Sequence, residues 1–207
     1  MASIAPIRVE RPLAAEEAAR GDYYALLARF LSRPADGQLL ASLAAAGALP
    51  EGSRPELARA WNDLVAAAGA IDAPAAEAEY DALFGGVGKS QVSLYAGAYA
   101  GATAVEHPRV RIQRDLAAAG LAHHAPTEPE DHFAALFDAM RVLAVGGAGR
   151  TPAPIGEQRH FFESHVQPAA PKFFARLAAE PRAGFYRRVA ALGQAFVVLE
   201  NESFSLD

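Results

Sequence analysis

The stretch Thr127–Leu143, TEPEDHFAALFDAMRVL, decides the fold expected for this chain. Thr127 is a residue type that caps helices, and Glu130 three residues later completes a capping box. Pro129 falls in the first turn, where its missing backbone N–H costs no hydrogen bond. Apolar side chains then recur at helical spacing, at Phe133, Leu136, Phe137, Met140 and Leu143. The pattern predicts a central helix that begins at Thr127 and buries one face.

Acidic residues crowd the predicted start of this helix. Glu128, Glu130 and Asp131 place negative charge at the positive end of the helix dipole, and His132 follows them. Taken alone, these residues favour an ordinary acidic helix start with a half-buried histidine. The alternative is a charged pair at the rim of a binding groove.

Composition favours helices packed around one core. The 207 residues are 52% hydrophobic, much of this alanine, and 21% are charged, which excludes wholesale disorder. The length suits a single sizeable core, and no alternating strand pattern runs beyond a few residues. We therefore predict an all-α single domain of about ten helices over residues 12–207, after a flexible arm over residues 1–11.

Composition also excludes several classes of function. The chain has no cysteine, which rules out disulfides, cysteine-ligated zinc and thiol catalysis. It has neither a secretory signal nor an apolar run approaching the ~20 residues of a membrane span, so we expect a cytoplasmic protein without membrane contact. A net charge of −5 argues against nonspecific nucleic-acid binding and permits a basic peptide partner.

Local signals place further helix boundaries. Asp36 and Asp72 are predicted caps, and Ser53 with Glu56 forms a second capping box. We expect the helix after Asp72 to end near Phe84, and the last helix to cover residues 184–200.

The segment Gly88-Lys89-Ser90 ends like a phosphate-binding loop. That motif needs a glycine where Leu83 stands and a strand before the loop, whereas Tyr80–Phe84 has the pattern of a helix end. A nucleotide-binding protein that uses this loop stays an alternative function. Residues 85–94 also form the candidate hinge between two halves, through which a monomer would form a minor domain-swapped dimer.

The histidines do not follow a metal-binding pattern. His160 and His165 lie five residues apart, which turns their rings about 140° from each other on an α-helix. No Gly-x-Ser-x-Gly nucleophile motif is present either. We therefore predict no metal site, no cofactor and no catalytic residue.

Several motifs in order resemble the TorD/DmsD/NarJ family of cytoplasmic chaperones for molybdenum enzymes. One is Glu-Pro-x-Asp-His at residues 128–132, and another is Tyr-x-x-Leu-Phe-x-Gly-x-Gly at residues 80–88. The closing pattern of the family is matched by Gln158, Phe161 or Phe162, His165, Pro168, Phe185 and Tyr186. The chain departs from the family at Ala96-Gly97, where Glu-Ser is frequent, and at Ala169, where tryptophan is frequent.

The resemblance implies a chaperone that binds the N-terminal peptide of a molybdoenzyme catalytic subunit in its apo form, holding it until the cofactor is inserted. A twin-arginine signal is a basic segment followed by an apolar helix-forming stretch, and a groove for it needs an apolar floor and a carboxylate rim. The candidate peptide-binding residues are Tyr95, Tyr99, Phe133 and Phe137 for the floor, Glu128, Glu130 and Asp131 for the rim, and His132 for a hydrogen bond to the peptide.

Two further points follow from this assignment. If Asp131 and His132 serve binding, we expect them to contribute little to folding. The sequence does not name the client enzyme, and a helical scaffold without a groove stays the other alternative.

Overall fold

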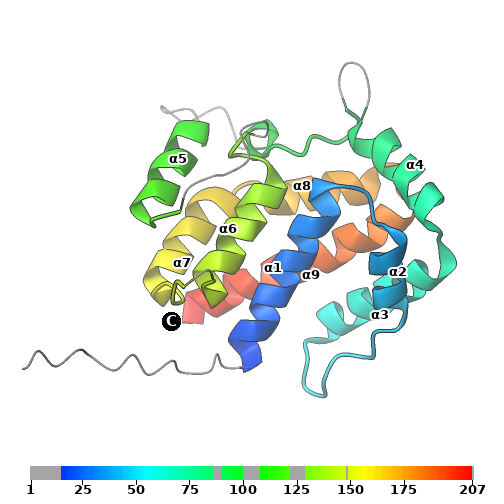
Figure 1. Cartoon of the computed structure of the whole chain (residues 1–207), viewed down its shortest axis with the longest axis horizontal. Coiled ribbons are helices and arrows are strands. Elements are labelled where there is room, and N and C mark those ends of the chain that lie inside the picture. The colour runs from blue at the N-terminus through cyan, green and yellow to red at the C-terminus, as the bar shows by residue number, and fades with distance from the viewer. Residues whose placement is uncertain (1–14, 86–89, 100–107, 122–128, 148, 207) are drawn as a thin grey trace, which may run out of the picture.

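The computed structural model describes residues 15–85, 90–99, 108–121, 129–147 and 149–206 (Figure 1). Across these residues the chain forms nine α-helices, a short 3₁₀ turn and a π-helical turn, and no strand, which confirms the all-α prediction. The elements in order are α1 (Ala15–Ser32), α2 (Gly37–Ala44), α3 (Pro55–Ala70), α4 (Ala73–Phe84), η1 (Ala96–Ala98), α5 (Pro108–Ala118), α6 (Phe133–Val145), α7 (Ile155–Phe161), η2 (Phe162–Val166), α8 (Ala170–Ala179) and α9 (Phe185–Leu206).

The helices α1, α6 and α9, from different parts of the chain, form the centre of the bundle. The first helix, α1, packs along α6, and α9 packs against both α3 and α8 (Figure 1). The largest fully buried side chains are mostly aromatic and come from α1, α6, η2, α8 and α9: Tyr24, Phe30, Phe133, Phe137, Phe162, Phe173, Phe174, Tyr186 and Phe196.

Aromatic stacking joins these helices. The ring of Phe133 in α6 lies 4.4 Å from that of Phe173 in α8, and Phe137 stacks on Phe174 one turn further along. Gly193 of α9 faces the Phe174 ring so closely that any Cβ there would overlap it. Glycine at this position therefore lets α8 and α9 approach, which favours the close packing of the core.

A buried carboxylate ties the first helix to the last. Glu200 of α9 is 1% exposed and accepts hydrogen bonds from Arg20 Nε at 2.7 Å, Arg20 Nη2 at 2.8 Å and the Tyr24 hydroxyl at 2.6 Å. Arg20 also donates to the side chain of Gln158 in α7, and Gln158 donates to the carbonyl of Ala153. A buried charge is costly unless it is paired and hydrogen-bonded, and here both carboxylate oxygens are satisfied.

The start of α9 is capped by a side chain from another helix. The carboxylate of Glu79 in α4 accepts hydrogen bonds from the backbone N–H groups of Gly184, Phe185 and Tyr186, at 2.8, 3.0 and 2.8 Å. These N–H groups have no partner inside the helix, and the positive end of the helix dipole favours a negative charge there. Glu79 therefore fixes where α4 lies relative to α9.

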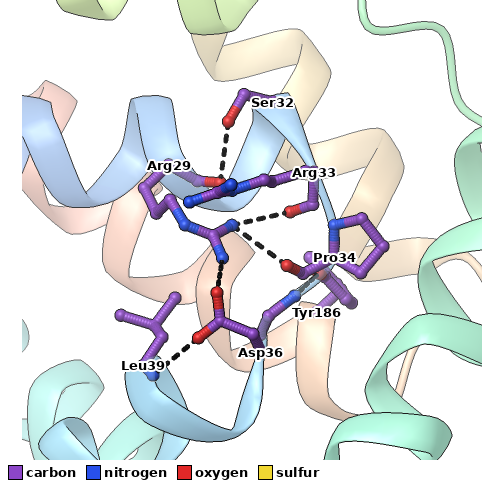
Figure 2. Close-up of polar contacts among 8 residues, drawn as sticks. Arg29, Ser32, Arg33, Pro34, Asp36, Leu39 and Tyr186 are labelled. Carbon is purple, nitrogen blue, oxygen red and sulfur yellow. Dashed lines mark hydrogen bonds and ion pairs between the residues drawn. The ribbon is translucent and has the colours of Figure 1, made fainter.

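The connection from α1 to α2 is also held by a carboxylate, as Figure 2 shows. Asp36 accepts a hydrogen bond from the backbone N–H of Leu39 and pairs with Arg29 of α1. Arg29 in turn donates to the carbonyls of Arg33 and Pro34. The predicted caps at Asp36 and Asp72 are both confirmed, since Asp72 accepts from the N–H of Ala75 at 2.9 Å.

Other predicted helix boundaries are wrong. The central helix begins at Phe133 instead of Thr127, and Pro129–His132 forms a turn in which the His132 N–H donates to the Pro129 carbonyl. Thr127 itself lies outside the described residues. The capping box predicted at Ser53 is absent, because the Ser53 hydroxyl donates backwards to the carbonyl of Pro50.

The ends of two further elements bear on the predictions. The last helix continues six residues beyond Glu200, to Leu206, and buries Phe204. The helix before the candidate hinge ends at Phe84 as predicted.

The candidate hinge at 85–94 is described only in part, because residues 86–89 lie outside the described ranges. Its second half is anchored. Val92 and Leu94 are buried, and the Val92 N–H donates to the carbonyl of Leu83. The exchange of halves between two chains stays a prediction.

The buried carboxylate generates a test of stability. Glu200→Ala leaves the partly buried guanidinium of Arg20 without its only carboxylate among the described residues, so we expect the free energy of unfolding to fall by about 3–5 kcal/mol. Urea unfolding followed by circular dichroism measures this change.

The matched control lies two residues along the same helix. Glu202 pairs with Arg54 at the surface, with 45% of its side chain exposed, so Glu202→Ala should cost less than about 1 kcal/mol. Equal losses in the two variants would contradict the central role given to Glu200.

Candidate functional site

The predicted site residues come from two segments that meet at the N-terminal end of α6. The Ala96 N–H donates to the Asp131 carbonyl at 2.8 Å, and the Phe133 N–H donates to the Leu94 carbonyl at 2.9 Å. Tyr95 and His132 thereby form an isolated antiparallel bridge. This pairing holds the backbone at His132 in an extended conformation, so the helix cannot begin before Phe133. For this reason α6 starts later than its sequence pattern predicts.

Asp131 and His132 are buried rather than exposed on a rim. Their exposed fractions are 6% and 4%. His132 is the N-cap of α6, because its Nδ1 accepts a hydrogen bond from the Ala134 N–H at 3.2 Å. The Asp131 carboxylate lies 3.4 Å from the Gly97 N–H, and a Cβ at Gly97 would crowd that carboxylate. Asp131 therefore lies before the helix instead of in its first turn, and both side chains help to form the turn.

The aromatic candidates divide into buried and exposed members. Phe133 and Phe137 are fully enclosed in the core, so in this structure neither ring lines an open groove. Tyr99 is half-buried, with its hydroxyl donating to the Ser93 carbonyl. Tyr95 is 40% exposed, and its ring meets that of His132 edge to face at 5.3 Å. Tyr95 thus presents an aromatic surface on a rigid support.

Glu130 connects this turn to α5. Its carboxylate accepts a hydrogen bond from the Gln113 amide and lies 3.4 Å from the Arg109 guanidinium. The hydrogen bond from Gln113, with support from Arg109, lowers the pKa of Glu130. The last rim candidate, Glu128, lies outside the described residues.

A second polar cluster was missed by the sequence analysis. His165 Nε2 lies 2.8 Å from the Asp115 carboxylate of α5, and His160 Nε2 lies 3.8 Å from the same oxygen. The expectation that the two rings diverge is wrong, since both face Asp115. His160 lies at the end of α7 and His165 in the π-helical turn η2 that follows, where the hydrogen bond from Gln167 to Phe162 spans five residues, so the angle of an α-helix does not apply across this junction. Residues five apart return to the same face in such a turn. A five-residue spacing of histidines was the only available signal.

Burial and charge act in opposite directions on this cluster. Burial lowers the pKa of His165, although the hydrogen bond to Asp115 opposes the change. Burial tends to raise the pKa of Asp115, but the contacts with His165 and Arg114 outweigh it and hold that pKa below its usual range. Within the described residues, no group of three or more histidine, aspartate or glutamate side chains is arranged to hold a metal ion.

The surroundings of Gly88-Lys89-Ser90 bear on the alternative function of nucleotide binding. The segment before Gly88-Lys89-Ser90 is the end of α4, where a phosphate-binding loop needs a strand, and residues 86–89 themselves lie outside the described ranges.

Every helix in the described part of the chain is too short or too polar to span a bilayer.

The fold and this turn define an all-helical protein with an internal Asp-His motif that fixes its central helix. The family model for the nitrate reductase delta subunit matches residues 51–175, which is more than half of the chain, and the chain therefore belongs to this family. Its members are chaperones for the maturation of molybdenum enzymes and are not enzymes. The resemblance to the TorD/DmsD/NarJ chaperones is thereby confirmed. A search among curated proteins returned no match.

The position of His132 leads to a prediction that reverses the expectation from sequence. His132→Ala removes the N-cap of α6, so the free energy of unfolding should fall by about 0.5–2 kcal/mol. Urea unfolding measures the change. Phe137→Ala, which empties a core position, should cost about 3–5 kcal/mol and calibrates the scale. A His132 variant as stable as the wild type would show that the cap is dispensable.

The buried histidine predicts a pH dependence. Because the pKa of His165 is lowered by folding, the unfolded chain takes up a proton near about pH 6.5 that the folded chain does not. The contribution of neutral His165 to the free energy of unfolding is therefore complete above that pH. It is lost as the pH drops through the lower pKa of the folded state. Urea unfolding between about pH 5 and pH 7 measures this limb.

Two variants isolate the contribution of His165 to that limb. His165→Gln should flatten the acid limb relative to the wild type. His160→Gln is the control, since 69% of the His160 side chain is exposed and its loss should leave the limb in place. Identical pH profiles for the wild type and the His165 variant would contradict the prediction.

Proposed function

We propose that this chaperone acts in the cytoplasm and binds the N-terminal peptide of a molybdoenzyme catalytic subunit. The peptide would be a twin-arginine signal or a related basic segment followed by an apolar helix-forming stretch. The proposed surface is the turn at Tyr95–Tyr99 together with the entry to α6 at Glu130–His132. Holding the peptide would delay export or assembly until the client has received its cofactor.

The observation that carries this proposal is that the side chain of Tyr95 is exposed while His132, which holds it, is buried. Aromatic side chains that are held rigid and accessible are frequent anchors of binding energy in interfaces. Tyr95 is held by the backbone bridge to His132 and by the contact of the two rings. An apolar stretch of the client would pack on this ring at little cost in side-chain entropy.

Carboxylates beside this ring suit the basic part of the peptide. Glu130 lies in the same turn as His132, and its contact with Arg109 is long, at 3.4 Å. An arginine of the client would compete with Arg109 for that carboxylate and would make a shorter, charge-assisted hydrogen bond. Glu128 would extend the acidic rim.

The candidate residues that are buried would act on binding by holding the turn in place. Asp131 and His132 position the turn that carries Tyr95, and Phe133 and Phe137 hold that turn on the core. Tyr99 contributes the edge of its half-buried ring. Substitution of these positions would change peptide affinity through the shape of the turn as well as through direct contact.

The test uses a labelled synthetic peptide with two consecutive arginines before an apolar helix-forming stretch, and fluorescence anisotropy as the readout. Tyr95→Ser should weaken binding by about tenfold or more, the loss of one aromatic anchor. It should leave the fold intact because the ring is 40% exposed. A peptide with glutamates in place of the two arginines should also bind more weakly.

The control variant is Ile155→Ser at the start of α7. Ile155 is 44% exposed, close to the value for Tyr95, and lies outside the proposed surface. Failure of the wild type to bind the peptide would refute the proposed function. Equal losses in the two variants would instead refute the placement of the site.

A further inference from the structure

The segment 91–99, which carries the exposed tyrosine of the proposed site, is held at both ends by two cationic side chains of α8. Lys172 Nζ donates a hydrogen bond to the carbonyl of Tyr99 at 3.1 Å, and Arg176 Nη2 donates to the carbonyl of Gln91 at 2.9 Å. Residues four apart on an α-helix lie on the same face, so both donors reach the segment from one side of α8. The two contacts therefore bracket the ring on which the proposed function depends.

Little regular structure supports this segment from within. Its helical element is the three-residue turn η1, and the backbone of its middle is paired with the entry to α6 through the Leu94 carbonyl and the Ala96 N–H. The carbonyls at its two ends are bound by the side chains of α8. A hydrogen bond from a charged donor is about twice as strong as one between neutral groups, which suits two single contacts that hold a backbone in place.

Tyr99 joins the first of these contacts to the rest of the segment. Its hydroxyl donates to the carbonyl of Ser93 at 2.9 Å, which closes the chain into a compact loop. Its ring lies 5.8 Å from that of Phe173 in α8 and 5.9 Å from that of Phe133 in α6. Fixing the Tyr99 carbonyl on α8 therefore fixes the loop that displays Tyr95.

Arg176 is itself held in position by a buried carboxylate. The same nitrogen, Nη2, donates to Glu180 at 2.9 Å, and 8% of the Glu180 side chain is exposed. Both hydrogens of this nitrogen are thus used, one on the segment and one on the residue that ends α8. A guanidinium presents its donors in a rigid plane, so fixing one hydrogen directs the other. The contact with the Gln91 carbonyl is therefore oriented from α8.

We propose that Lys172 and Arg176 are positioning residues for the surface around Tyr95. They hold the segment 91–99 in the conformation that binds the client peptide, and they make no contact with the peptide themselves. Preorganisation of a binding surface raises affinity because less conformational entropy is lost on binding. This inference rests on the proposed function and adds to it two side chains of α8 that set the affinity from outside the surface.

The direction of the expected change separates this role from an electrostatic one. Lys172 and Arg176 are both cationic and exposed, Arg176 by 43% of its side chain. If their charges acted directly on a basic peptide, removing them would relieve repulsion and strengthen binding. If they position the segment, removing them weakens binding.

The first measurement follows the segment without any peptide. Hydrogen exchange of the full chain, detected by mass spectrometry, compares the wild type with the double variant Lys172→Met, Arg176→Met. The amides of residues 91–99 should exchange several-fold faster in the double variant, while those of α6 and α9 keep their wild-type rates. Arg188→Met is the control, because Arg188 is exposed on α9 and its guanidinium binds no described residue, so exchange in the segment should stay as in the wild type.

The second measurement uses the labelled peptide with two arginines and fluorescence anisotropy. The double variant should bind about tenfold more weakly than the wild type, with an unchanged midpoint of urea unfolding because both side chains are exposed. Lys172→Arg keeps a charged donor at this position and should bind as the wild type does, whereas Lys172→Met should not. That rescue would identify the hydrogen bond to the segment as the source of the effect.

Three results would overturn the inference while leaving the proposed function in place. They are wild-type exchange rates in residues 91–99 of the double variant, an affinity of the double variant equal to or tighter than that of the wild type, and a Lys172→Arg variant as weak as Lys172→Met. Absence of peptide binding by the wild type is a different outcome, which would refute the proposed function and this inference with it.

Discussion

The carboxylate of Glu200 is almost completely removed from water, and the arrangement that satisfies it constrains the whole bundle. Arg20 and Tyr24 reach it from the first helix, 180 and 176 residues away in the chain, and Gln158 extends the network to α7. Burying a charge is tolerated only when the geometry of its partners is good, so α1, α7 and α9 have little freedom to shift against one another. The aromatic core then fills the space that this framework defines.

The same reasoning explains how the candidate site is held. Phe133 stacks on Phe173, and its N–H is bound by Leu94, so the start of α6 is fixed both from the core and from the adjacent turn. His132 caps the helix at the point where the backbone leaves the bridge with Tyr95. A motif that marks this family is therefore used here to build the turn, and the accessible part of the surface is the aromatic ring that the turn displays.

The helix α5 illustrates how polar contacts position an element that buries few side chains. Ile112 and Leu116 are its buried aliphatic residues, and its outer contacts are polar. Asp115 holds it to the π-helical turn through His165, and Gln113 holds it to the candidate site through Glu130.

The sequence by itself determined the fold class, the family and the features that depend on a few neighbouring residues. Asp36 and Asp72 cap helices as expected because a cap binds an N–H three residues away, and the helix before the candidate hinge ends at Phe84. The apolar spacing along α6 also predicted correctly which face is buried. These features follow from local geometry, which a sequence pattern records directly.

Only the tertiary structure decided the contacts between distant residues. The capping of α9 by Glu79, the pairing of Glu200 with Arg20 and the contact of His165 with Asp115 each join segments that no local pattern relates. The start of α6 was misplaced for the same reason, since the Leu94 carbonyl binds the Phe133 N–H, which a helix from Thr127 would direct to the carbonyl of Pro129. A local preference of about 1 kcal/mol gives way when distant backbone groups must be satisfied in the same buried volume.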